Sequence, residues 1–275
     1  MNISIFKNMT SKLPLPGLLE GVANLIRSDE KLAVFTQSYR QTGSKTFKSE
    51  CQLFSVACLF EGGKGKENIT GLTGMSLVDF DHIAPSNSPK GESLAELKAK
   101  IIADPHTLMC YTTISGNGLR VIFKYELPNT NDFGLNTNCT NNTNNENTII
   151  SGENKFVRFE RFVFKNNIDK ISSFYQSAFF CGNAYYEKLL GLKADMQCKN
   201  LTRLSGLAHD PEVFLRAEGE VVPFTAEEIT TAAAAYAKQS KEDKQMQRIQ
   251  TYFDTLIAPQ LAKDNIVFQS GSHNE

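Results

Sequence analysis

Two strand-like runs joined by a short glycine-rich turn constrain the fold of this chain more than any other feature. Residues 107–114 and 119–125 are mainly apolar, and the turn Ser-Gly-Asn-Gly occupies residues 115–118 between them. Asn-Gly between two such segments is a strong hairpin signal, because both residues tolerate the left-handed backbone that tight hairpin turns require. The sequence therefore predicts a pair of antiparallel strands here.

The rest of the chain alternates between strand and helix patterns. We expect strands at residues 3–6, 53–60, 74–81, 157–164 and 203–208, and a basic loop at residues 40–48. We expect helices at residues 18–27, 29–39, 92–103 and 169–190, and two more between 226 and 261 with a charged link at 238–244. Because hairpin connections are mixed with helices, this order predicts an α+β fold rather than a doubly wound parallel sheet.

Two parts of the chain are expected to lie outside this core. Residues 129–150 are rich in Asn and Thr, which is typical of a disordered insertion. We expect residues 1–224 to form one domain and residues 225–275 a helical extension.

Composition limits the function without identifying it. Of 275 residues, 41% are hydrophobic and 21% are charged, which is typical of a globular protein. The net charge is -1, so any nucleic-acid site must be a local basic patch. The six cysteines form no Cys-x-x-Cys pair, which argues against a zinc site and favours reduced thiols in the cytoplasm. No apolar stretch approaches the roughly 20 residues of a membrane span, and no signal-peptide core opens the chain.

Asp79-Phe80-Asp81 follows the apolar run at residues 74–78. Residues two apart on a strand face the same way, so the two carboxylates are expected side by side. Their mutual repulsion favours a cation between them, and carboxylate oxygens suit Mg²⁺ or Mn²⁺. The alternative is a solvated strand end that runs into the proline-containing turn at residues 85–89.

Three segments in order resemble a known superfamily. They are the strand ending in Asp79-Phe80-Asp81, the hairpin of residues 115–120, and residues 192–204 with Asp195 and Arg203. This order resembles the archaeo-eukaryotic primase superfamily, the primase-polymerases. Within it, the chain is most similar to the VirE N-terminal, BT4734-like domains of Bacteroidetes mobile elements, over residues 45–224. The resemblance implies an RRM-like antiparallel sheet with an N-terminal α/β module and C-terminal helices.

The resemblance also implies roles for individual residues. The catalytic Mg²⁺ or Mn²⁺ would be held by Asp79, Asp81 and Asp195. The nucleotide would be bound by Ser115, Gly116, Gly118, Arg120, Arg203 and His209. Arg120 stands where many primases have a histidine, and a guanidinium also binds phosphate well. A patch for the nucleic-acid template would consist of Lys45, Lys48, Lys64 and Lys66.

The function implied is that of a metal-dependent nucleotidyltransferase. It would use nucleoside triphosphates on a single-stranded DNA template, in replication of a mobile element, with a separate helicase as a possible partner. One alternative is a non-catalytic nucleic-acid-binding relative. Another is a glycosyltransferase that uses Asp-x-Asp to hold Mn²⁺ and a sugar nucleotide. If Asp195, Arg203 and the hairpin turn serve only the structure, the chain is an α+β domain with an unknown binding role.

Overall fold

The computed structural model describes residues 1–86, 88, 91–127 and 161–263. The chain divides into two compact units, Met1–Thr230 and Thr231–Glu275. Helices and antiparallel sheets make up the first unit, so the expected α+β class is confirmed. The Asn/Thr-rich insertion predicted at residues 129–150 lies outside the described residues.

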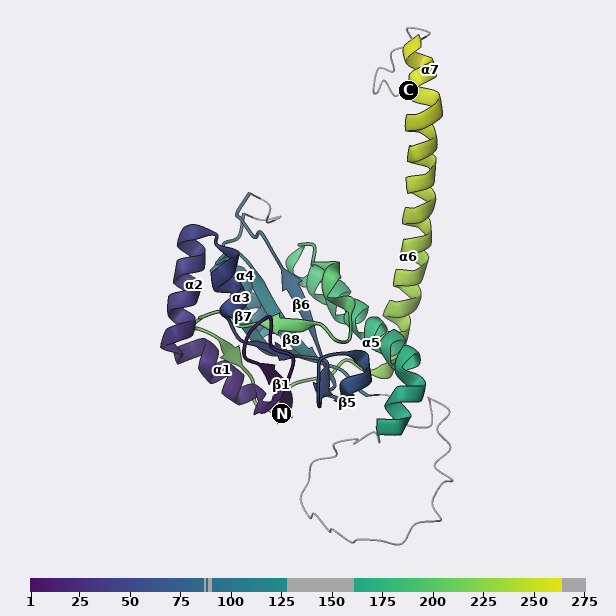
Figure 1. Cartoon of the computed structure of the whole chain (residues 1–275). Helices are drawn as coiled ribbons and strands as arrows, with labels where there is room; N and C mark the ends of the chain where they lie inside the picture. Colours follow the sequence, from purple (N-terminus) through teal and green to yellow (C-terminus); the bar gives the residue numbers. More distant parts are fainter. Residues whose placement is uncertain (87, 89–90, 128–160, 264–275) are drawn as a thin grey trace, which may run out of the picture. The chain divides into compact units, whose positions relative to one another are not determined.

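The central sheet contains the predicted hairpin. Its strand order is β10-β7-β8-β6, with every neighbouring pair antiparallel. The strands are β6 (Met75–Phe80), β7 (Thr107–Thr112), β8 (Leu119–Lys124) and β10 (Phe214–Leu215). Helices α4 (Leu94–Ala103) and α5 (Arg161–Leu190) pack against this sheet (Figure 1).

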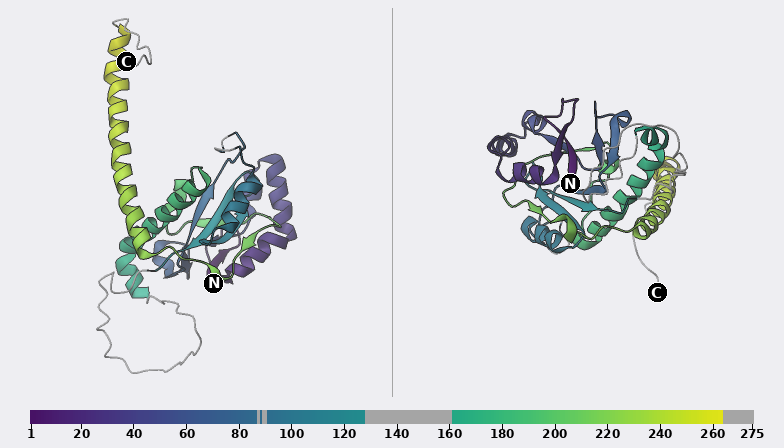
Figure 2. Two further views of the ribbon diagram at one scale, coloured as in Figure 1. Left: turned by 180° about the vertical axis from the view of Figure 1, so that it is seen from behind. Right: turned by 90° about the horizontal axis from the view of Figure 1, so that it is seen from below.

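A second sheet has the order β2-β1-β3-β9. Its strands are β1 (Asn2–Phe6), β2 (Leu15–Leu18), β3 (Leu53–Ser55) and β9 (Leu204–Gly206). A separate antiparallel pair consists of β4 (Cys58–Phe60) and β5 (Ile69–Leu72). Helices α1 (Leu19–Ser28), α2 (Glu30–Thr42) and α3 (Lys45–Glu50) belong to this N-terminal part, which Figure 2 shows from two further sides.

Local sequence signals account for several helix boundaries. The Asp29 carboxylate accepts the Leu32 N–H at 2.7 Å and so caps the start of α2. Ser93 and Glu96 form a reciprocal capping box at the start of α4. These bonds satisfy N–H groups that have no partner within the helix, which explains why α2 begins at Glu30 and α4 at Leu94.

Alternation along β6 gives its two faces different partners. The Ser76 hydroxyl lies 3.3 Å from the Tyr175 hydroxyl of α5, so this face is covered by the helix. Leu77 and Asp79 belong to the opposite face and line a cavity. The strand thus buries one face under α5 and presents Asp79 on the other side.

The structure corrects the predictions for two N-terminal segments. The basic segment at residues 40–48 is not a single loop, because α2 continues to Thr42 and α3 begins at Lys45. Gly43 in the left-handed conformation (φ 67°) separates the two helices. The single strand expected at residues 53–60 is two strands in different sheets, and the chain bends between them where the Ala57 carbonyl accepts the Thr73 N–H.

Two predictions in the C-terminal half are also corrected. Of the strand expected at residues 157–164, residues 161–164 belong to α5, and the others lie outside the described residues. The charged segment at residues 238–244 is no link but part of one helix, α6 (Ala226–Tyr252), because Lys, Glu and Gln are good helix formers. The irregularity comes later, as a π-helical turn (Phe253–Ile257) before α7 (Ala258–Lys263).

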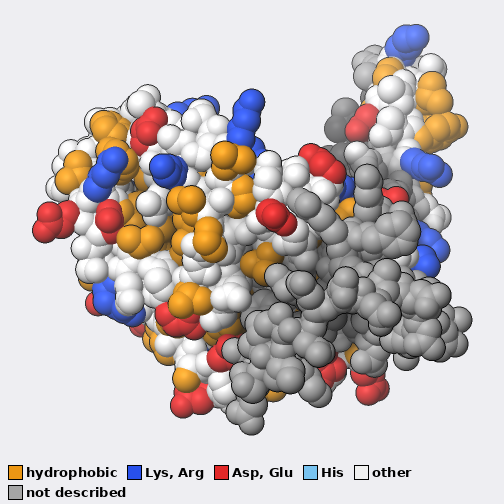
Figure 3. Space-filling model, turned by 60° about the horizontal axis from the view of Figure 1, so that its bottom comes forward, with side chains coloured by type: hydrophobic (Ala, Val, Ile, Leu, Met, Phe, Trp, Pro, Cys, Tyr) orange, Lys and Arg blue, Asp and Glu red, His pale blue; other side chains and the backbone are white. Residues whose placement is uncertain are grey.

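Among the described residues, no helix has both the length and the apolar character needed to cross a membrane. Acidic and basic side chains are interspersed over the described part of the face shown in Figure 3. This mixture is consistent with the net charge of -1, so a site for an anion has to be a local one.

Candidate functional site

A row of polar side chains crosses the central sheet. In the strand register, Asp79 of β6 lies opposite Arg120 of β8, and Arg120 lies opposite Tyr111 of β7. Directly opposed residues of antiparallel strands project from the same face. The strand register therefore brings a carboxylate, a guanidinium and a phenol together on the face away from α5.

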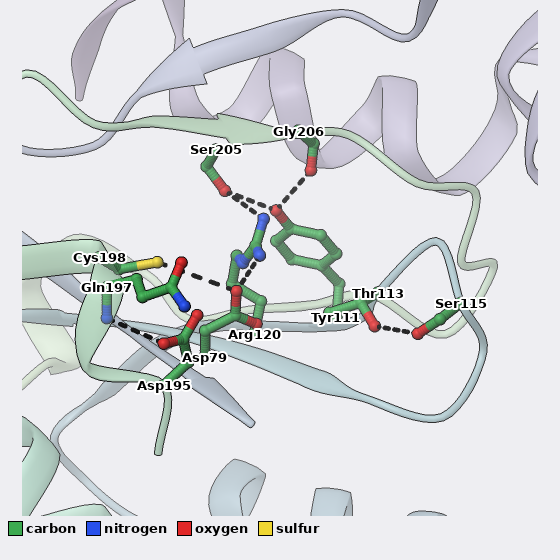
Figure 4. A network of polar contacts seen from close by, with 10 residues as sticks. All are labelled: Asp79, Tyr111, Thr113, Ser115, Arg120, Asp195, Gln197, Cys198, Ser205 and Gly206. Atoms are coloured by element: carbon green, nitrogen blue, oxygen red, sulfur yellow. Dashed lines mark hydrogen bonds and ion pairs between the residues drawn. The ribbon is translucent and has the colours of Figure 1, made fainter. Parts of the chain in front are cut away.

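Arg120 connects this row to the second sheet. Its guanidinium forms an ion pair with the Asp79 carboxylate and donates to the Ser205 hydroxyl of β9 at 3.0 Å. The Tyr111 hydroxyl lies 2.9 Å from the same Ser205 oxygen and donates to the Gly206 carbonyl at 3.0 Å (Figure 4). Burial alone would lower the pKa of Arg120. The neighbouring Tyr111 and Asp79 outweigh this effect and raise the pKa above its usual value.

Asp195 reaches the same place from a distant part of the chain. Its backbone N–H donates to the Asp79 carbonyl at 2.8 Å, which fixes this segment beside the end of β6. Its carboxylate accepts the Gln197 N–H at 2.8 Å and caps a short 3₁₀ helix, η3 (Met196–Lys199). One ligand atom each from Asp79, Asp195 and Cys198 lie within 4.8 Å of one another.

Asp79 is a buried member of this group, with 4% of its surface exposed. Its Oδ2 carries the Arg120 ion pair and lies 4.0 Å from the Cys198 Sγ. Its Oδ1 is buried and has no hydrogen-bond partner among the described residues. A buried carboxylate oxygen without a partner is costly, so this atom is open to a cation.

The group faces a cavity of about 740 Å³ between the two sheets. Besides Asp79, Arg120, Asp195 and Cys198, its charged and hydroxyl-bearing lining includes Lys48, Lys64, Asp81, Ser115, Thr202, Arg203 and Ser205. Asp81 follows β6, is exposed at the rim, and is not part of the three-residue group. Loss of hydration and the neighbouring Asp79 carboxylate raise the pKa of Asp81.

The hairpin turn meets the end of β6 at close range. A side-chain carbon on Gly118 would lie 2.6 Å from the Phe80 carbonyl oxygen and 2.6 Å from the Thr113 hydroxyl. Gly116 has φ +79° and lies against the Arg40 side chain. Close packing and backbone conformation thus account for both glycines. Of the three turn residues predicted to bind the nucleotide, Ser115 lines the cavity.

Several predicted site residues lie elsewhere. Lys45 begins α3 and Lys66 begins the 3₁₀ turn η1 (Lys66–Asn68), and neither lines the cavity. His209 is also absent from the lining, and its backbone N–H donates to the Thr36 hydroxyl at 2.9 Å. The structure therefore gathers the predicted Asp79, Asp81, Asp195, Ser115, Arg120, Arg203, Lys48 and Lys64 around one cavity.

Sequence reasoning missed three contributors: Tyr111, Cys198 and Ser205. Cys198 follows Asp195 by three residues, a spacing that places both on one side of a 3₁₀ turn. Tyr111 could have been found by extending the hairpin register across the sheet. Ser205 carries no local signal, because its position depends on β9 pairing with β3 in the other sheet.

The donor atoms fit a divalent cation. Two carboxylates from separate segments converge, and one buried oxygen has no partner among the described residues. Asp79 and Asp195 would hold the ion. The Arg120 guanidinium weakens the binding of such an ion, because the guanidinium already neutralises part of the negative charge on Asp79.

Fold and site together define an α+β domain with a carboxylate-lined cavity between two sheets. The family model described as BT4734-like, N-terminal domain matches residues 46–215, which is more than half of the 275 residues. The chain belongs to this family, and the predicted resemblance to BT4734-like domains is confirmed. No curated protein and no solved structure matches the chain.

Proposed function

We propose that this domain is a metal-dependent nucleotidyltransferase, a primase-polymerase that acts on single-stranded DNA. The observation that carries the proposal is the meeting of Asp79 and Asp195, distant in sequence, in a cavity with basic side chains at its edge. The predicted resemblance to primase-polymerases supports the same reading. A cavity of about 740 Å³ has room for a nucleotide.

In the proposed reaction, a 3′-hydroxyl oxygen attacks the α-phosphorus of a nucleoside triphosphate. A new P–O bond forms, the bond to the β-phosphate oxygen breaks, pyrophosphate leaves, and the hydroxyl proton passes to water. Bound Mg²⁺ or Mn²⁺ would supply Lewis-acid stabilisation of the attacking and leaving oxygens. Asp79 and Asp195 would hold that charge in place, and Asp81 at the rim would add to the negative field.

Basic residues around the cavity suit the anionic substrates. Arg203 is exposed and lines the cavity close to β9, where a guanidinium can bind triphosphate oxygens. Lys48 and Lys64 line another part of the wall, and Lys64 Nζ donates to the Met9 carbonyl at 3.1 Å. In the proposed function these two lysines would contact the phosphates of a template strand.

One observation favours a second candidate, a non-catalytic domain that binds nucleic acid. The Arg120 guanidinium already compensates the charge of Asp79, so the row of Asp79, Arg120 and Tyr111 has balanced charges without a metal ion. In that case the basic residues would bind single-stranded DNA and the carboxylates would serve the structure.

Asp195→Asn is the variant that separates the two candidates. It removes a charge from the cluster, while the amide oxygen can still accept the Gln197 N–H that caps η3. Asp79→Asn is less suitable, because it would leave the buried Arg120 charge without its partner. Asp169→Asn, on an exposed position of α5 outside the cavity lining, is the matched control.

The test incubates each protein with single-stranded DNA, labelled nucleoside triphosphates and Mg²⁺ or Mn²⁺. We expect oligonucleotide products from the unaltered protein and from Asp169→Asn, and a loss of at least about 100-fold in Asp195→Asn, the size of effect that one electrostatic group commonly has on a transfer reaction. Equal template binding by all three proteins, with products from none, would support the non-catalytic candidate instead.

A further inference from the structure

Cys198 lies among the carboxylates without a role in the reaction proposed above. It is buried, with 3% of its surface exposed, in the 3₁₀ turn that Asp195 caps. With three residues per turn, side chains at positions i and i+3 of such a helix lie on the same side. The fold therefore presents the Asp195 carboxylate and the Cys198 sulfur together to Asp79.

We propose that Cys198 is a metal ligand and that its sulfur makes the site prefer thiophilic divalent cations, such as zinc, over Mg²⁺. The inference rests on the proposed position of a cation between Asp79 and Asp195. Two carboxylate oxygens and one sulfur are a mixed donor set, whereas Mg²⁺ sites consist of oxygen ligands. Sulfur ligands favour zinc and related ions.

The distances are compatible with one shared ion. Bonds of about 2.3 Å to sulfur and 2.0–2.2 Å to oxygen place tetrahedral ligands about 3.5 Å apart. The three ligand atoms lie within 4.8 Å of one another. The Cys198 Sγ lies 4.0 Å from Oδ2 of Asp79, the other oxygen of the carboxylate whose Oδ1 has no partner among the described residues. Side-chain rotations that move these atoms by about 1 Å would close the difference.

A second observation points to a ligand independently of the cysteine. Asp79 is 4% exposed, and its Oδ1 has no hydrogen-bond partner among the described residues. Arg120 occupies the other oxygen, so the unpartnered atom remains available to a metal ion while the ion pair persists. When the sulfur–metal bond forms, the thiol proton leaves to solvent.

Cadmium is a suitable probe, because a cadmium–thiolate bond has an ultraviolet charge-transfer absorption that carboxylate coordination lacks. The full chain is titrated with Cd²⁺ alone, beside Cys198→Ser and the matched control Cys181→Ser, a buried cysteine of α5 outside the cluster. We expect the absorption in the unaltered protein and in Cys181→Ser. In Cys198→Ser we expect no such absorption, and we expect the affinity for Cd²⁺ to fall by on the order of 100-fold. Residues that only support a metal ligand contribute up to about 100-fold to metal affinity, so the loss of a ligand should cost at least as much.

Asp195→Asn provides a check if Cys198→Ser folds poorly. This variant keeps the sulfur, so the absorption should persist but should require a higher Cd²⁺ concentration. Zn²⁺ should displace Cd²⁺ from the unaltered protein, and a large excess of Mg²⁺ should not. Absorption that is unchanged in Cys198→Ser, absent from the unaltered protein, or abolished by Mg²⁺ would overturn the proposal.

The outcome is separable from that of the proposed function. Product synthesis without cadmium–thiolate absorption would leave the nucleotidyltransferase proposal standing and reject the sulfur ligand. Absorption without product synthesis would establish the metal site and reject the enzyme.

Discussion

At the scale of single residues, Arg120 and a metal ion compete for the charge of Asp79. The guanidinium is held in place by Ser205 and by its position in the cross-strand row with Tyr111. Two carboxylates and one guanidinium leave the cluster with a smaller negative charge than the carboxylates alone would have. Because unit charges about 4 Å apart interact by several kcal/mol at the dielectric of a partly buried site, this compensation must weaken the affinity for a divalent cation.

Arg120→Gln is therefore expected to bind Mn²⁺ at least about tenfold more tightly than the unaltered protein, a change of about 1.4 kcal/mol in binding free energy. Without metal, its melting temperature should fall, because Asp79 loses the partner of a buried ion pair. Added Mn²⁺ should restore much of that loss. Isothermal titration calorimetry and thermal melts with and without Mn²⁺ measure both effects.

Arg203→Gln is the control for this measurement. It removes the same charge from the cavity wall, but Arg203 is exposed. Its affinity for Mn²⁺ should change much less than that of Arg120→Gln. If both variants bind Mn²⁺ as the unaltered protein does, Arg120 does not oppose the metal.

At the scale of elements, local signals predicted some of the fold and long-range pairing decided the rest. The 107–125 hairpin and the strand that carries Asp79 followed from residue pattern alone, since each is a short-range feature. The split of residues 53–60 between two sheets did not, because both halves are mainly apolar and their strand partners are distant in the sequence. The same applies to Ser205, which enters the site through the pairing of β9 with β3.

The turn between β7 and β8 offers a test of how closely the hairpin fits the end of β6. In Gly118→Ala, the added methyl would lie 2.6 Å from the Phe80 carbonyl oxygen and 3.1 Å from Asp81 Oδ1. Because the backbone at Phe80 cannot yield as a flexible side chain would, we expect a loss of about 1–3 kcal/mol in unfolding free energy. Urea denaturation provides the measurement.

Gly21→Ala is the matched control for this substitution. Gly21 lies in α1, and an added methyl there has no neighbour within 4 Å. Since alanine favours a helix over glycine, this variant should gain about 0.5–1 kcal/mol. A Gly118→Ala protein as stable as the original would show that the turn can move away from β6.

At the scale of the whole molecule, a buried ion pair joins segments from three places in the sequence. Asp210 Oδ2 accepts from Lys98 Nζ of α4 at 2.8 Å and from the Thr112 N–H of β7 at 2.7 Å. The side chains of Asp210 and Lys98 are 7% and 8% exposed. The Asp210 N–H also donates to the Ile26 carbonyl at 2.9 Å, so this residue ties α1 to the central sheet.

This pair sets a pH dependence of stability. Burial alone would raise the pKa of Asp210, but the bonds from Lys98 and the Thr112 N–H outweigh it and lower the pKa below its usual value. A carboxyl group with a lowered folded-state pKa stabilises the fold above its unfolded value of about 3.9. That contribution is lost as the pH falls from there through the lower, folded-state pKa.

Asp210→Asn should accordingly lose about 3–5 kcal/mol of unfolding free energy near pH 7, because it leaves the Lys98 charge buried without its partner. Its deficit against the unaltered protein should shrink as the pH falls below about 4, because the unfolded chain then binds the Asp210 proton before the folded protein does. Urea unfolding curves across this pH range measure the difference.

The double variant Lys98→Met/Asp210→Asn should recover most of the loss at pH 7, since neither charge of this pair remains. Glu92→Gln, which removes one partner of the more exposed Glu92–Lys100 pair, should change stability by less than about 1 kcal/mol. Parallel pH profiles for Asp210→Asn and the unaltered protein would show that the pair does not link protonation to folding.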